Sequence, residues 1–133
     1  MEYMTLIMDG ITYRVRIVYN SLVRAFDLIE GRNADDMLSG LRERDLLGTK
    51  YSYTMEIEPD PRYQGDYDAL FDALSDPVNS HTIAVPYGQG TLTYSAMIES
   101  GSDTYRGKVA MVRRWGGLSV NFQAIDVQKR PTT

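Results

Sequence analysis

The residues of this chain best placed to do chemistry are carboxylates in two groups. Asp68, Asp72 and Asp76 are spaced four apart, which puts them on one face of a helix. A calcium site needs about six to eight oxygen ligands, usually from a curled loop, so a solvated helix face is the better interpretation. Glu56 and Glu58 alternate along a predicted strand. A carboxylate pair can hydrolyse a glycosidic bond, but that reaction also needs a cleft and a raised pKa on one partner.

The other candidates for catalysis are weaker still. The chain has no cysteine, which excludes disulfides, thiolate metal sites and cysteine nucleophiles. His81, its single histidine, begins a predicted strand, so we expect a structural role and not a general base. Gly88 and Gly90 lack the third glycine and the following helix of a dinucleotide fingerprint. We expect Trp115 to be buried at a strand end, and we expect no enzyme, cofactor or metal centre.

Composition narrows the class of protein further. A length of 133 residues predicts a single domain, 1–133, with a core of its own. The formal net charge of −4 argues against nonspecific binding of nucleic acid. No segment approaches the roughly 18 consecutive apolar residues of a membrane span. We therefore expect a protein made in the cytoplasm, without a membrane partner, that stays soluble until it assembles.

The elements that must position these residues are mainly strands. Alternating apolar residues predict strands at 4–8, 11–19, 22–30, 49–58, 81–87, 91–99, 109–115 and 118–127. Residues 66–75 have the spacing of one amphipathic helix, whose apolar side must dock on a sheet. Residues 100–108 are polar and glycine-containing, which predicts a flexible loop. The predicted fold class is mainly β (α+β): an antiparallel β-sandwich or partly closed barrel with one flanking α-helix. We find no internal repeat in the sequence.

The strand at 49–58 has the clearest alternation in the chain. One of its faces is apolar and carries Tyr51, Tyr53, Met55 and Ile57. The opposite face is polar and carries Lys50, Ser52, Thr54, Glu56 and Glu58. Such a pattern is typical of a sheet with one face on the core and one in water.

A long polar loop is predicted between two strands, at residues 31–48. Loops of this length are uncommon in compact domains and are usually functional or disordered. Arginines in it could form ion pairs across a subunit boundary or simply be solvated. Its apolar residues need a surface that buries them, and another subunit is a natural candidate. The predicted subunit-interface residues are Met37, Leu38, Leu41, Arg42, Arg44, Leu46 and Leu47.

Several runs of the sequence resemble small tail proteins of prophages in Gram-positive bacteria. These runs are GLRERDLLGTKYSYTMEIEP, YDALFDALSDP, SHTIAVPYGQGTLTYSAMI and WGGLSVNFQAI, and the resemblance covers roughly residues 10–127. Such proteins are similar to the tail-tube and distal-tail (baseplate) families of long-tailed phages. The resemblance implies a β-sandwich with a flanking helix and a long inter-strand loop. It also implies a ring of six copies around a central channel, in a virion tail made in the host bacterium.

From this resemblance we expect a structural subunit whose partners are other copies of itself and other phage tail proteins. DNA would pass through the ring only in transit, without specific binding. The polar face from Lys50 to Glu58 is then the predicted channel-facing surface, because a wet and non-basic wall lets DNA slide. The alternative is a small binding module that uses residues 31–48 to hold a ligand or a cell-surface glycan.

Overall fold

The computed structural model describes residues 3–30 and 46–130, which form a mainly β structure with one helix. The confirmed part of the predicted fold is this antiparallel, mainly β architecture with a helix packed against it. The elements are β1 (Tyr3–Met8), β2 (Ile11–Ile17), β3 (Val23–Glu30), β4 (Leu46–Pro59), α1 (Gln64–Leu74), β5 (His81–Tyr87), β6 (Gly90–Met97), β7 (Gly101–Val109) and β8 (Val112–Ala124).

Six of the strands close into a barrel. The neighbours run β4, β2, β1, β5, β6 and β8, and the pairing of β8 with β4 completes the circle. All of these pairs are antiparallel. The barrel interior holds the core, whose fully buried members include Met8, Tyr53, Ile57, Ile83 and Phe122. Because the circle closes, each barrel strand has a paired neighbour on both sides, and the paired stretches have no open edge.

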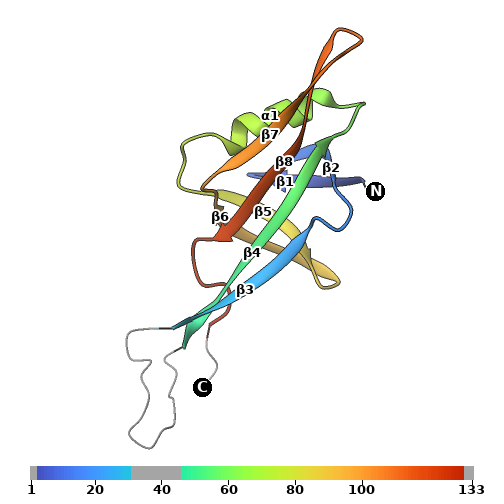
Figure 1. Ribbon diagram of the computed structural model, residues 1–133. Coiled ribbons are helices and arrows are strands. Elements are labelled where there is room, and N and C mark those ends of the chain that lie inside the picture. Colours follow the sequence, from blue (N-terminus) through green and yellow to red (C-terminus); the bar gives the residue numbers. More distant parts are fainter. Residues whose placement is uncertain (1–2, 31–45, 131–133) are drawn as a thin grey trace, which may run out of the picture.

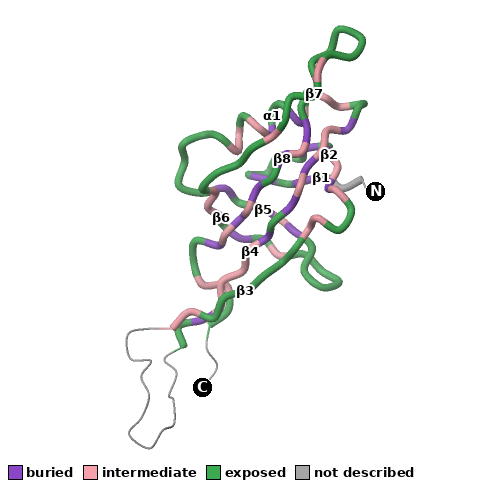
Figure 2. The backbone as a smooth tube through the Cα atoms, viewed as in Figure 1, coloured by how far each residue is buried: buried purple, intermediate pink, exposed green. Residues whose placement is uncertain are grey.

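The remaining two strands extend the barrel at opposite ends. β3 pairs with β4 between Leu46 and Thr54, and β7 pairs with β8 between Val112 and Val120. Figure 1 shows the resulting β3–β4 ribbon projecting at one end and the β7–β8 hairpin projecting at the other. Figure 2 shows both projections largely exposed, while the barrel strands alternate between buried and exposed residues.

The two halves of the chain follow the same path, although their sequences show no repeat. β1 and β2 form a tight hairpin, β3 follows as an outer strand after a short break, and β4 is a long strand that returns to the barrel. β5 to β8 repeat this order, with β7 as the outer strand and β8 as the long one. The halves join through β1 with β5 and β4 with β8. Buried positions also correspond, for example Leu6 with Val85 and Val15 with Tyr94. The repeat therefore lies in the alternation of buried positions and not in residue identity.

The helix packs at the barrel end from which the β7–β8 hairpin projects (Figure 1). Tyr67 and Leu70 are buried in the core, whereas Phe71 and Leu74 are half-buried against it. The Tyr67 hydroxyl donates a hydrogen bond of 2.9 Å to Asp103 on β7. Burial, together with this acidic neighbour, raises the pKa of the Tyr67 hydroxyl. The predicted apolar stripe is thus confirmed as the side facing the barrel.

Four sequence predictions differ from the structure in detail. Residues 101–109 form β7 and not a flexible loop, and Leu46 to Gly48 begin β4 instead of ending a loop. β8 is continuous through Gly116 and Gly117 instead of two strands at 109–115 and 118–127, and of the two alternatives for these glycines, a break or a bulge, the register shift with β7 favours the bulge. Trp115 is 41% exposed. It lies in the part of β8 that precedes the pairing with β4 and extends beyond the barrel, packed against Tyr105 with ring centroids 4.9 Å apart.

Candidate functional site

The predicted channel-facing residues lie together on the outer, polar face of β4. Thr54 is exposed, while Lys50, Ser52, Glu56 and Glu58 are half-buried by neighbouring side chains. β3 and β8 extend this face on either side, because Asp27 is opposite Lys50 and Asn121 is opposite Thr54. The Asn121 amide donates a 2.6 Å hydrogen bond to the Thr54 hydroxyl. Strands β4, β8 and β7 therefore carry a polar face, and β3 adds Asp27 to it together with the small or apolar Ala25 and Val23.

An ion pair crosses this face from β7 to β4. The Arg106 guanidinium donates to both carboxylate oxygens of Glu58, and the bond to Oε2 is 2.8 Å long. This contact raises the pKa of Arg106. The pair lies over the backbone of Gly116 on the intervening strand, where a Cβ would be 2.5 Å from a Glu58 oxygen. The glycine at 116 thus leaves the space that the ion pair occupies.

The charged side chains placed on this face nearly balance. Asp27, Glu56 and Glu58 are acidic, and the basic residues are Lys50, Arg106 and Arg16, which lies opposite Glu58 on β2. Arg106 neutralises Glu58, and Asp27 lies opposite Lys50, so Glu56 is the acidic residue without a basic residue opposite it or bonded to it among those named. The face is wet and polar without an excess of cations.

The predicted interface residues are split by the limits of the described structure. Met37, Leu38, Leu41, Arg42 and Arg44 lie outside the described residues. Leu46 and Leu47 begin β4, and their side chains are 38% and 47% exposed. They extend the exposed apolar surface of the β3–β4 ribbon, which sequence reasoning did not predict. Phe26 and Leu28 of β3 are exposed on one face of this ribbon, and Val23 is exposed on the other.

Both outer strands have one open edge within the described residues. β3 pairs with β4 alone and β7 pairs with β8 alone, so they are the two ends of the strand order. Open edges present unpaired backbone N–H and C=O groups, which other chains can pair with. All residues of β3 from Val23 to Leu28 are exposed. This combination of an open edge and exposed apolar side chains is a feature of surfaces that bind another protein.

A groove of about 490 Å³ lies where the β3–β4 ribbon leaves the barrel. Its wall includes Arg24, Phe26, Tyr51 and Tyr87, with Lys129 from the C-terminal segment. The Tyr51 and Tyr87 hydroxyls are hydrogen-bonded at 2.9 Å, and their rings meet edge to face. The Arg24 guanidinium lies 5.5 Å from the Tyr87 ring centroid. The groove is therefore aromatic with a basic component.

The carboxylates considered for catalysis have structural surroundings. Asp68 and Asp72 are exposed on α1, and Asp76 follows its end, as expected for a solvated surface. His81 is buried, and its Nδ1 lies 2.6 Å from the Asp9 carboxylate. Burial raises the pKa of Asp9, but hydrogen bonds with His81 and the Thr82 N–H outweigh burial and lower it. This pair fixes the first hairpin against β5 and is consistent with the structural role predicted for His81.

Comparisons with known proteins assign no family. No protein-family model matches the chain, and no curated protein matches it at a significant level. In the described residues, no group of three or more histidine or acidic side chains is arranged to hold a metal ion. No helix in that part of the chain is long and apolar enough to cross a membrane.

Proposed function

We propose that this chain is a structural subunit of a phage tail that assembles into a ring around a DNA channel. The observation that carries the proposal is the pair of open edges, on β3 and β7, at the two ends of one strand order. A ring of identical subunits uses two different surfaces, one on each side of the subunit, repeated until the circle closes. The resemblance to tail-tube and distal-tail proteins supplies the identity of the particle and the expected number of six copies.

The directions of the strands favour such an arrangement. β3, β4, β8 and β7 alternate in direction, because each adjacent pair is antiparallel. When copies are related by rotation about an axis, β7 of one copy and β3 of the next are again antiparallel. Backbone pairing between them would satisfy both open edges and join the outer faces of neighbouring subunits.

The polar face then forms the channel wall in this proposal. Its near balance of charge, with Arg106 held by Glu58, provides no cluster of free cations to bind phosphates. DNA-binding proteins gain affinity by releasing counterions through such contacts. A wall without them lets DNA move through.

Residues 31–48 stay part of the proposal as an additional contact to a neighbouring subunit, and a variant lacking residues 34–45 should fold as a monomer that assembles poorly.

A matched pair of substitutions tests the β3 surface. Phe26 is 65% exposed on β3, and Tyr19 is 72% exposed in the turn before it. Phe26→Asp should abolish rings or tubes in sedimentation and electron microscopy, because a carboxylate cannot be buried unpaired at an interface. Tyr19→Asp is the control and should assemble normally. Assembly of Phe26→Asp at wild-type levels would exclude β3 from the interface.

A second candidate function, glycan binding, is favoured by the aromatic groove beside the β3–β4 ribbon. Aromatic rings provide apolar faces on which sugar rings can stack, and a groove of about 490 Å³ has the size of a ligand site. This candidate predicts a monomer at high concentration. It also predicts that Tyr87→Ala removes binding in a glycan array. An assembled ring without glycan binding would reject it.

A further inference from the structure

The tip of the β7–β8 hairpin is apolar and projects from the body of the molecule. Val109 and Val112 pair across the turn and are 54% and 41% exposed. Between them, Ala110 and Met111 both have positive φ, of 51° and 69°. Such turns usually contain asparagine or glycine, since other side chains are strained there. Met111 is nevertheless 86% exposed, so strain and exposed apolar area are concentrated at one point.

Two cations stand directly below this tip. Lys108 and Arg113 are opposite each other across the hairpin, next to the valine pair. Both side chains are exposed, and neither forms an ion pair with another described residue. Like charges directly opposite on two strands destabilise the hairpin in an isolated chain. An anionic surface that receives the tip would remove that repulsion.

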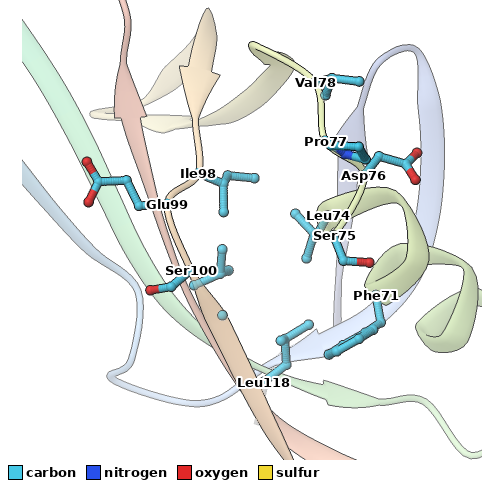
Figure 3. Close-up of a pocket in the computed structure, with 12 residues that line it drawn as sticks. Phe71, Leu74, Ser75, Asp76, Pro77, Val78, Ile98, Glu99, Ser100 and Leu118 are labelled. Atoms are coloured by element: carbon cyan, nitrogen blue, oxygen red, sulfur yellow. The ribbon is translucent and has the colours of Figure 1, made fainter.

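A cavity with complementary properties lies elsewhere on the same chain. It has a volume of about 360 Å³ and lies between the end of α1 and the segment joining β6 to β7. Figure 3 shows Phe71 and Leu74 on one side, with Ile98 and Leu118 across from them. Val78 forms part of the entrance and is 56% exposed. The cavity is therefore apolar inside and open to a side chain from outside.

Two acidic residues lie at the margins of this cavity. Asp76 lies on the helix side and Glu99 on the strand side, and Figure 3 shows their carboxylates turned outward, away from the cavity. Both residues are exposed, and neither forms an ion pair with another described residue. The tip has one cation on each strand, and the cavity has one carboxylate on each side. The tip and the margins of the cavity thus combine apolar side chains with charges of opposite sign.

We propose that the β7–β8 tip of one copy inserts into this cavity of a neighbouring copy, with Met111 as the anchor. The contact joins two different surfaces of the same chain, so it is repeated from copy to copy. It rests on the proposed function, because it is an additional contact within the assembled tail structure. Lys108 and Arg113 of the inserted tip face Asp76 and Glu99 of the receiving copy.

Disulfide trapping tests this contact cleanly, because the natural chain has no cysteine. Met111→Cys protein is co-assembled with an equal amount of Val78→Cys protein that carries a mass tag. Mild oxidation should give a disulfide-linked heterodimer on a non-reducing gel. Met111→Cys mixed with Thr12→Cys is the matched control, since Thr12 is exposed on the outer face of β2. Equal heterodimer yields in the two mixtures would overturn the proposal.

Charge reversal provides an independent measurement. Asp76→Lys with Glu99→Lys should cause loss of the trapped heterodimer, because cations would then face cations. Adding Lys108→Glu and Arg113→Glu to the same chain should restore it. Failure of the fourfold variant to restore trapping, in a chain that unfolds cooperatively like the wild type, would overturn the charge pairing. Rings seen by electron microscopy without trapping would reject this contact and leave the proposed function standing, whereas a persistent monomer would reject both.

Discussion

Replacing Leu70 by alanine should destabilise the fold more than replacing Phe71, although phenylalanine is the larger residue. Leu70 is fully buried between α1 and the barrel, with 0% of its surface exposed. Deleting such a side chain removes its transfer free energy and leaves a cavity, which costs about 3–4 kcal/mol. Phe71 is half-buried and already borders a cavity of about 360 Å³. Its loss should therefore cost about 1–2 kcal/mol.

The assay is urea unfolding followed by circular dichroism, with free energies extrapolated to water. Phe26→Asp serves as the background for every variant, because assembly would otherwise add to the apparent stability. Ala69→Ser is the control on the exposed side of α1, and its effect should stay within about 0.5 kcal/mol. A larger loss for Phe71→Ala than for Leu70→Ala would show that the helix is rotated from the orientation described.

Three further predictions concern the barrel margin, the pH dependence and the polar face. Gly48→Ala should lower the free energy of unfolding by about 2 kcal/mol in urea. The φ angle of Gly48 is 148°, and the new Cβ would lie 2.1 Å from a methyl group of Val127 in the C-terminal segment. A variant as stable as the wild type would mean that this segment does not pack against Gly48. Asp66→Asn should be less stable than wild type at pH 7, and the difference should shrink below about pH 4. The reason is that the Arg14 guanidinium lowers the pKa of Asp66 in the folded state below its value of 3.8 in the unfolded chain. The stabilisation of the fold by this ion pair is therefore present above the unfolded pKa and is lost as pH falls through the folded pKa. A stability difference independent of pH would contradict this. Ser52→Lys with Glu56→Lys should give the assembled protein a salt-sensitive affinity for duplex DNA, measured by fluorescence anisotropy. The control, Ser52→Gln with Glu56→Gln, should show no DNA affinity. Loss of assembly without DNA affinity would place this face at a subunit interface.

Local patterns were sufficient to predict most individual elements. Alternation predicted β5 at residues 81–87, and the structure has the same bounds. The helix was predicted within about two residues at each end, because its apolar spacing and the Asp76–Pro77 stop are local signals. The polar face of β4 was predicted residue by residue from a period of two.

Sequence patterns did not predict the features that depend on contacts between distant parts of the chain. Closure of the barrel depends on β4 pairing with β8, more than 60 residues away along the chain. β7 was mistaken for a loop because a strand exposed on both faces has no apolar alternation. The burial of Trp115 was overestimated for the same reason, since its strand lies outside the barrel at that point. The tip and its matching cavity lie on distant segments, so their complementarity emerges with the fold.

Electron microscopy of the purified wild-type chain tests the central claim most directly. The proposed tail subunit should form rings or tubes with a central channel, with six copies per ring in class averages. Phe26→Asp should appear as monomers under the same conditions. A wild-type chain that stays monomeric at high concentration, with no ring in any class, would contradict the assembly function and favour the binding module.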